Sequence, residues 1–257
     1  MAKFTLLPAL LSFFTTSLWA QAEKIDTDRP DQTESAVTVP KNYFQAEFGF
    51  NKEKTFFDNY DLIHPTALLK YGLNRFEFRL EATCRSSYEH LIPDPKWTTG
   101  FDPIEIGFKA AMWEEKNWIP KTSFIFHLGL PTLASKPFRA DHLAPSFRLT
   151  MQHTLSHTIG LGYNFGVAWD GFSTTPAWLY TLTSGFNLGE KWYAYLEAFG
   201  FAHNEEKPQH SLDGGIAYYI SPDMKVDVSG GFGISGAAPG NYVAVGVSFR
   251  FNTKRRK

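Results

Sequence analysis

Apolar and polar residues alternate with a period of two along most of the chain. In the stretch 75–83, apolar residues at positions 76, 78, 80 and 82 alternate with Glu77, Arg79 and Glu81. Successive side chains of a β-strand point to opposite faces, so such a stretch has one apolar and one polar surface. After the first 22 residues there is no run of 18 apolar residues, which excludes a helical membrane protein.

Stretches of this kind recur often enough to predict an all-β protein with twelve strands. The predicted strands are 43–50, 62–71, 75–83, 104–110, 124–130, 146–152, 159–169, 177–187, 191–200, 211–220, 224–233 and 242–251. In 191–200 both faces are apolar enough to leave the inward face open, because Tyr193 and Tyr195 share a face with Glu197.

The lengths of the strands and of their connections favour a transmembrane antiparallel up-and-down β-barrel over a soluble β-sandwich. Several predicted strands have about 10 residues, which is the length that crosses a bilayer at a tilt. Short connections such as 72–74 and 221–223 alternate with longer ones such as 84–101 and 131–144. Outer-membrane barrels have short periplasmic turns and longer outer loops, so both chain ends are expected on the periplasmic side.

The two ends of the chain divide it further. Residues 1–22 have Lys3, an apolar stretch and a small-residue cleavage site at Ala20-Gln21-Ala22, which predicts a signal peptide for export. We expect residues 23–40 to form a periplasmic segment, 41–251 the barrel and 252–257 a basic periplasmic tail. The expected location is the outer membrane of a Gram-negative bacterium, in contact with its lipid.

The last predicted strand ends on a pattern that resembles the signal read by the barrel assembly machinery. In that signal a glycine is followed by aromatic or apolar residues three and five positions later, as in Gly246, Phe249 and Phe251. Most proteins with this signal stop at the aromatic residue, whereas this chain continues to Lys257. The assembly machinery is therefore an expected partner.

The start of the expected mature chain resembles one family. The residues 25–35, IDTDRPDQTES, and 39–50, VPKNYFQAEFGF, resemble the meta-pathway phenol-degradation family of outer-membrane transporters. The resemblance implies a channel-like barrel and passive passage of small solutes, aromatic or hydrophobic ones among them.

The polar strand faces are expected to line the lumen. The candidates are Glu77, Arg79, Glu81, Glu105, Lys109, Arg148, Gln152, Asp213, Asp227 and Arg250. Two interpretations remain open: a ladder that sets the charge preference of a pore, or mixed charges that neutralise one another and fix strand register.

A second set of charges lies before the first strand. Glycines at 160, 162 and 166 point inward from 159–169 and leave room in the lumen, either for a conduit or for an inserted segment. The polar segment 23–39 is the candidate for insertion, through Asp26, Asp28, Arg29, Asp31 and Glu34. A mobile tail is the alternative interpretation.

Composition excludes several other classes. The formal net charge is −1 and only the extreme C-terminus is strongly basic, so no nucleic-acid partner is expected. No cofactor, metal site or catalytic residue is predicted. The alternatives are a lipid-hydrolysing barrel using Ser156 with His153 or His157, and a surface protein that acts through its outer loops. A loop metal site at His203 and His210 with Glu205 and Glu206 is a further, less favoured alternative.

Overall fold

A computed structural model describes residues 24–92, 96–204 and 206–254. The predicted signal peptide and the last three residues of the basic tail lie outside the described residues. Among those described, no helix has the length and apolar character that a membrane crossing requires.

The described residues form thirteen β-strands and three short 3₁₀ helices. The strands are β1 (Tyr43–Lys54), β2 (Tyr60–Leu73), β3 (Phe76–Tyr88), β4 (Trp97–Phe101), β5 (Ile104–Trp113), β6 (Lys121–Leu130), β7 (Ala144–Thr154), β8 (Ile159–Ala168), β9 (Ala177–Leu188), β10 (Trp192–His203), β11 (Gln209–Ser221), β12 (Met224–Gly233) and β13 (Asn241–Asn252). The 3₁₀ helices, all in loops, are η1 (Phe56–Asp58), η2 (Pro131–Leu133) and η3 (Lys136–Phe138).

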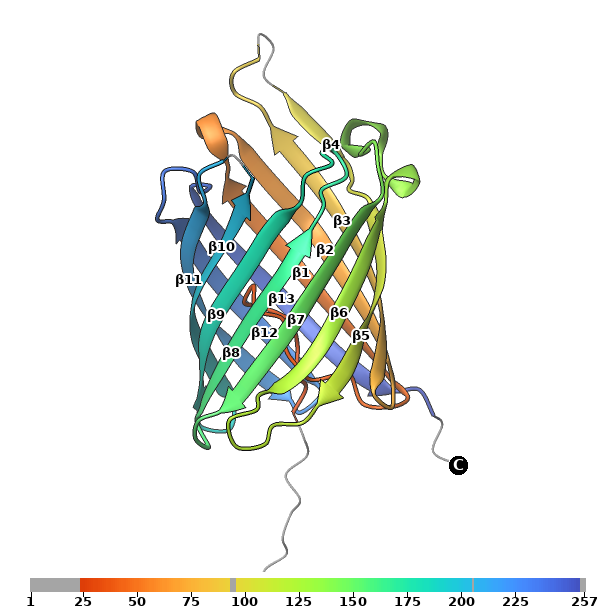
Figure 1. The fold of residues 1–257 in the computed structure, drawn as a ribbon, viewed down its shortest axis with the longest axis vertical. Coiled ribbons are helices and arrows are strands. Elements are labelled where there is room, and N and C mark those ends of the chain that lie inside the picture. The colour runs from red at the N-terminus through yellow and green to blue at the C-terminus, as the bar shows by residue number, and fades with distance from the viewer. Residues whose placement is uncertain (1–23, 93–95, 205, 255–257) are drawn as a thin grey trace, which may run out of the picture.

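Twelve of these strands close into one antiparallel barrel (Figure 1). Each wall strand pairs with its neighbours in the chain, and β1 pairs with β13 to complete the circle. Closure gives every wall strand two partners, which a sheet must have to satisfy its backbone groups in lipid. The predicted fold, an up-and-down barrel of twelve strands, is confirmed.

The thirteenth strand corrects one predicted loop. The sequence predicted that 84–101 is a loop, but β3 continues to Tyr88 and β4 pairs with its last five residues. Strand β5 pairs with β3 only as far as Glu81, so the upper part of β3 has a free edge on that side. An unpaired edge attracts another strand, and the short β4 occupies it.

The two faces of the wall differ as the alternation predicted. Phe78 is 59% exposed on the outer surface, whereas its neighbours Glu77 and Arg79 are buried inside the barrel. Strand β10, whose inward face the sequence left open, turns Tyr195 and Glu197 inward and leaves Leu196 68% exposed. An outer apolar surface and an inner polar surface are what a barrel in a bilayer requires.

The connections between strands differ in length at the two ends of the barrel. The short turns lie at the end of the barrel where the described chain begins and ends, and the longer loops with η1, η2 and η3 lie at the other end (Figure 1). The first end corresponds to the periplasmic side and the second to the outside. Trp118 and Trp192 lie at periplasmic turns and Trp178 near an outer loop, all exposed, as aromatic residues at membrane interfaces are.

Candidate functional site

The lumen of the barrel contains residues 24–40, which we call the inner segment (Figure 1). It has no regular secondary structure, so its backbone groups need other partners. Wall side chains supply them: Glu77 accepts from the Val39 N–H at 2.7 Å, and Asn164 accepts from the Glu34 N–H at 2.7 Å. Irregular backbone at membrane depth is tolerated where protein surrounds it, which is the case here.

The centre of the inner segment is held by a cluster that we call the charged anchor: Asp28 with Lys70, Arg79 and Lys109. The carboxylate of Asp28 lies 2.6 Å from Lys70 Nζ, 2.9 Å from Arg79 Nη1 and 2.9 Å from Lys109 Nζ. These cations come from β2, β3 and β5, so one carboxylate joins three wall strands. All four residues are buried, and in that environment each charge needs its partners.

Further carboxylates complete the charged anchor. Glu47 of β1 accepts hydrogen bonds from the Asp28 and Arg29 N–H groups, at 3.1 and 3.2 Å, and pairs with Lys70. Arg79 also contacts Glu34 at 2.7 Å and Glu77 at 3.1 Å. Burial alone would raise the pKa of Asp28, but Lys109, Lys70 and Arg79 hold that pKa well below its usual range.

Arg29 occupies a space that two glycines leave open. Gly49 of β1 and Gly246 of β13 face each other in register. A Cβ on Gly49 would lie 2.2 Å from Arg29 Nη1, and a Cβ on Gly246 would lie 2.4 Å from Arg29 Nε. From this position Arg29 Nη2 reaches Asp227 of β12 at 3.0 Å. The guanidinium lies directly against the backbone, so a side chain at either glycine would displace Arg29 from this position.

The opposite side of the inner segment is held by uncharged donors, in a contact that we call the hydroxyl latch: Thr33 with Thr181 and Glu197. The Thr33 hydroxyl lies 2.6 Å from the Thr181 hydroxyl and donates to Glu197. The second oxygen of Glu197 accepts from the Gln32 N–H at 2.7 Å. Strands β9 and β10 therefore bind the segment at its turn, through hydrogen bonds alone.

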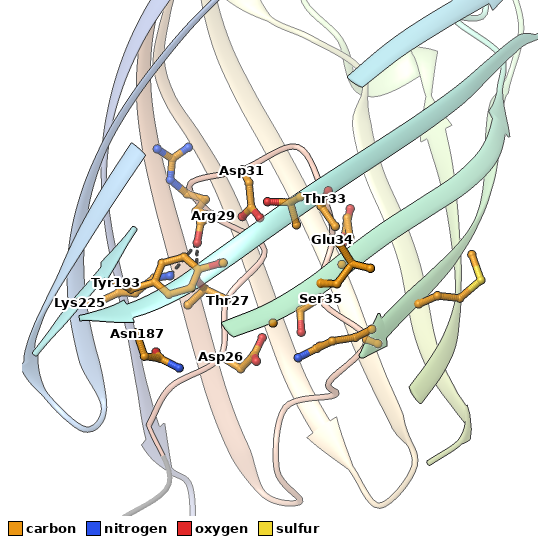
Figure 2. A pocket seen from close by; sticks show the side chains of 18 of the residues that line it. Asp26, Thr27, Arg29, Asp31, Thr33, Glu34, Ser35, Asn187, Tyr193 and Lys225 are labelled. Atoms are coloured by element: carbon orange, nitrogen blue, oxygen red, sulfur yellow. Dashed lines mark hydrogen bonds between the residues drawn. The ribbon is translucent and has the colours of Figure 1, made fainter. Parts of the chain in front are cut away.

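An inner cavity of about 210 Å³ lies beside the inner segment, toward the periplasmic end (Figure 2). Its wall is partly made of Gly160, Gly162 and Gly185, which have no side chain to fill it. Asp31 and Thr33 line its other side, and Lys225 donates to the Arg29 carbonyl at 2.7 Å nearby. The room predicted from the glycines is therefore shared between the inserted chain and open space.

An outer cavity, also of about 210 Å³, lies toward the long loops. Gln32 of the inner segment lines it, together with residues of β1, β10, β11 and β13. Thr33 lines the inner cavity and Gln32 the outer one, so the hydroxyl latch lies between the two spaces.

The structure gathers the predicted lumen residues into separate groups. Glu77, Arg79 and Lys109 belong to or contact the charged anchor, and Arg148 donates to the Gln32 carbonyl at 3.1 Å. Gln152 lines the inner cavity, and Asp227 binds Arg29. Asp213 accepts from Tyr242 and Tyr195, and the Nε of Arg250 lies 2.7 Å from Asp223 at a periplasmic turn.

Glu81 and Glu105 lie opposite each other and near His127, with ligand atoms within 4.8 Å. That is a group that could hold a metal ion, and the sequence predicted none. However, Arg79 Nε donates to His127 Nε2 at 2.8 Å, so the proton of a neutral His127 is on Nδ1. Nδ1 faces Glu105 at 3.5 Å and has no free lone pair for a cation. In this arrangement His127 offers no ligand atom to a cation, which leaves the two carboxylates.

The remaining inserted charges and the terminal pattern have definite positions. Asp26 and Asp31 line the inner cavity, and the Asp26 carbonyl accepts from Gln45 at 2.7 Å. In the last strand, Phe251 is 51% exposed on the outer surface, and the Phe249 ring lies 6.2 Å from that of Phe48. Gly246, predicted from the terminal pattern alone, also accommodates Arg29.

Several contacts of this site were missed in the sequence. Lys70 was passed over because the inward face of β2 also includes the apolar Leu68, which weakens the alternation. Thr33 and Thr181 are ordinary polar residues in sequence, and nothing there indicates that they meet. Glu197 was not identified because the sequence left open which face of β10 points inward. A single carboxylate among aromatic residues was nevertheless a signal that could have been used.

Comparisons with known proteins agree with this architecture. An outer-membrane channel from Pseudomonas putida F1 is 7% identical, with a TM-score of 0.68, over 86% of this chain and all of that one. The KdgM porin, solved with oligogalacturonate, is 10% identical with a TM-score of 0.54, over 80% of this chain and 99% of that one. The NanC porin is 9% identical, with a TM-score of 0.51, over 80% of this chain and 98% of that one. No protein with a curated description matches the sequence.

At this level of identity the solved structures establish only the fold, a closed antiparallel β-barrel. The family is established by the sequence comparison. The model of one family matches residues 27–251, which include most of the inner segment and all but the last residue of the barrel wall. The chain therefore belongs to the family described as "Putative MetA-pathway of phenol degradation".

Proposed function

We propose that this protein is an outer-membrane channel for small solutes and that the inner segment constricts its lumen. The observation that carries the proposal is the inserted chain itself, bound to opposite walls and flanked by cavities of about 210 Å³ on both sides. A barrel built only to present surface loops has no need of open space at both ends of its lumen.

The passage lies on the side of the hydroxyl latch. The charged anchor fills the lumen against β1, β2, β3 and β5, where buried ion pairs leave little space. The inner cavity lies against β7 to β12 and the outer one against β10 to β13 and the outer end of β1, and Gln32, Thr33 and Glu197 separate them. A solute passes from the outer to the inner cavity when these hydrogen bonds open.

Channel structures are among the proteins that share this fold, which supports the proposal. The first is described as an outer-membrane channel, and the KdgM and NanC proteins as porins. Small solutes are the class that lumen spaces of this size admit. The family's name refers to phenol degradation, and aromatic compounds are accordingly one group of solutes to test.

Conductance in planar bilayers tests the proposal. Deleting residues 24–38 should raise single-channel conductance several-fold over that of the full chain, because the lumen of a twelve-strand barrel is then open. Heat-dependent gel migration verifies that the deleted form is a folded barrel. Unchanged conductance in a folded barrel contradicts a constricting role for the segment, and an absence of conductance in both forms contradicts the channel.

The observed contacts do not favour lipid hydrolysis. Ser156 Oγ accepts from the N–H groups of Thr158 and Ile159, at 3.2 and 3.0 Å, as a turn residue does. His153 Nδ1 lies 3.4 Å from Glu115, and its Nε2 lies 3.3 Å from the Tyr163 hydroxyl. Of the loop metal candidates, His210 Nδ1 is bonded to the Tyr180 hydroxyl at 2.8 Å, and Glu205 lies outside the described residues.

A further inference from the structure

The outer cavity has a lining that differs from the rest of the lumen. Four residues with carboxamide side chains line it: Gln32 from the inner segment, Asn51 from β1, Gln209 from β11 and Asn241 from β13. Elsewhere the lumen is dominated by charges that pair with one another. A carboxamide offers both a donor and an acceptor, so this lining is suited to hydroxyl groups of a solute.

Two phenylalanines face the same cavity. Phe199 and Phe201 lie on the inward side of β10, with ring centroids 6.4 Å apart and ring planes at 82°. Inward phenylalanines are unexpected on a polar lumen face, and an edge-to-face pair presents the flat face of one ring beside the edge of the other. A ligand with one apolar face covers such a surface and removes it from water.

One polar atom in the cavity lacks a partner. Asn51 Oδ1 is buried, and no hydrogen-bond donor reaches it among the residues that the structure describes. A buried acceptor without a donor is unfavourable, and a rotation of the Asn51 carboxamide toward the cavity lets this oxygen accept from an incoming O–H or N–H group.

The charge of the lining restricts the ligand further. Glu53 is the one carboxylate among the described lining residues, and none of them is a lysine, arginine or histidine. An anionic solute would therefore meet a carboxylate and no cation, which disfavours sugar acids and aromatic acids.

From these observations we infer that the outer cavity is a binding site for an uncharged, polyhydroxylated six-membered ring, such as a neutral monosaccharide. The carboxamides bind its hydroxyl groups, Asn51 Oδ1 accepts one of them, and the ring's apolar face packs on Phe199 and Phe201. The inference rests on the proposed function, to which it adds the class of solute and the place of selection.

Binding to the full chain in detergent micelles tests this site without requiring conduction. The probes are methyl β-D-glucoside, the corresponding β-D-glucuronide, which adds one carboxylate, and phenol, which has a ring but one hydroxyl. Saturation-transfer NMR should give a clear signal for the glucoside. The expected dissociation constant is at least ten-fold higher for the glucuronide and for phenol.

Variants locate the binding. Asn51→Leu should weaken glucoside binding about ten-fold, and Phe199→Ser by a similar factor. The matched control, Asn252→Leu, alters an exposed asparagine at the periplasmic end and should leave binding unchanged. Phe201→Leu, which keeps an apolar side chain, gives a second test if Phe199→Ser fails to fold.

Three results would overturn the inference: equal or tighter binding of the glucuronide, tighter binding of phenol, or full glucoside affinity in folded Asn51→Leu. Conductance distinguishes this from failure of the proposed function. If the barrel conducts but does not bind the glucoside, only the inferred binding site is contradicted. If the barrel binds the glucoside but never conducts, only the proposed channel function is contradicted.

Discussion

The two walls that hold the inner segment do so by different chemistry. On one side, Asp28 meets three buried cations, and removal of its carboxylate takes one partner from Lys70 and Arg79 and the paired carboxylate from Lys109. On the other side, Thr33 and Gln32 meet Thr181 and Glu197 through hydrogen bonds. Breaking a buried ion pair costs about 3–5 kcal/mol, whereas a single hydrogen bond contributes about 0.5–1.5 kcal/mol between uncharged groups and about 1.5–3 kcal/mol to a charged one. The difference indicates that the charged anchor attaches the inner segment permanently to one wall, whereas the hydroxyl latch attaches it reversibly to the other.

The largest effect is expected from the charged anchor. Asp28→Ala leaves Lys70, Arg79 and Lys109 without their shared carboxylate, which should weaken docking of the inner segment by about 3–5 kcal/mol. Planar-bilayer recordings should then approach the conductance of the deleted form. The control is Asp223→Asn, which removes the charge of an exposed carboxylate that pairs with Arg250 at a periplasmic turn, and it should change conductance little. If Asp28→Ala conducts like the full chain, the anchor does not hold the segment.

Substitution of Gly49, which leaves room for Arg29, should give the next largest effect. Gly49→Ala places a Cβ 2.2 Å from Arg29 Nη1, so the flexible side chain must move and lose Asp227. Loss of a charged hydrogen bond of this kind costs about 1.5–3 kcal/mol. The expected result is a lower thermal unfolding midpoint for Gly49→Ala but no further loss when Gly49→Ala is added to Arg29→Ala.

Gly160→Ala is the matched control, because the atom nearest to its Cβ would be 3.8 Å away. If the decreases in unfolding midpoint are additive in the double variant, Gly49 and Arg29 act independently. That result would contradict the contact between them.

The hydroxyl latch should give a smaller effect. Thr33→Val keeps the shape of the side chain but removes its bonds to Thr181 and Glu197, at a cost of about 1–3 kcal/mol. Brief openings should become more frequent while the conductance of the fully closed state stays the same. Thr27→Val is a suitable control, because that hydroxyl bonds within the segment, to the Arg29 carbonyl at 2.6 Å. Equal effects of the two variants would contradict a specific role for the latch.

The smallest effect is expected from pH. The pKa of Asp28 is lowered when the segment is docked, so docking gains stability above the ordinary value of about 3.9 and loses it only as pH falls through the lower docked value. The contribution of Asp28 should therefore be constant from about pH 8 to pH 5. Titration of conductance in the full chain and in Asp28→Asn checks this. A loss of Asp28-dependent closure between pH 8 and pH 5 would contradict the assignment.

The wall of the barrel was predictable because apolar and polar residues alternate within each strand. One face of every strand meets lipid and the other meets the polar lumen, so the pattern can be recognised in each strand separately. β4 was not, because its pairing depends on where β5 stops beside β3. The charges of the inner segment were identifiable, but not their partners. Asp28 lies 42, 51 and 81 positions from Lys70, Arg79 and Lys109, and only the closed barrel brings these four together.

Gly246 shows how one residue can have two explanations. Its spacing to Phe249 and Phe251 suggested a terminal assembly signal, a role that stays a prediction. In the structure its missing side chain also leaves room for Arg29, from a segment more than 200 positions earlier. The sequence pattern alone suggests the role in assembly. The role in accommodating Arg29 becomes visible only when β13 pairs with β1.

The claim that the lumen opens at the hydroxyl latch can be tested by locking it. Thr33→Cys with Thr181→Cys, in a Cys84→Ser background, places two thiols where the hydroxyl oxygens are 2.6 Å apart, close to disulfide geometry. Oxidation, followed by mass spectrometry to verify the bond, should reduce solute flux into liposomes to background, and reduction should restore it. Undiminished flux with the disulfide fully formed would contradict the account.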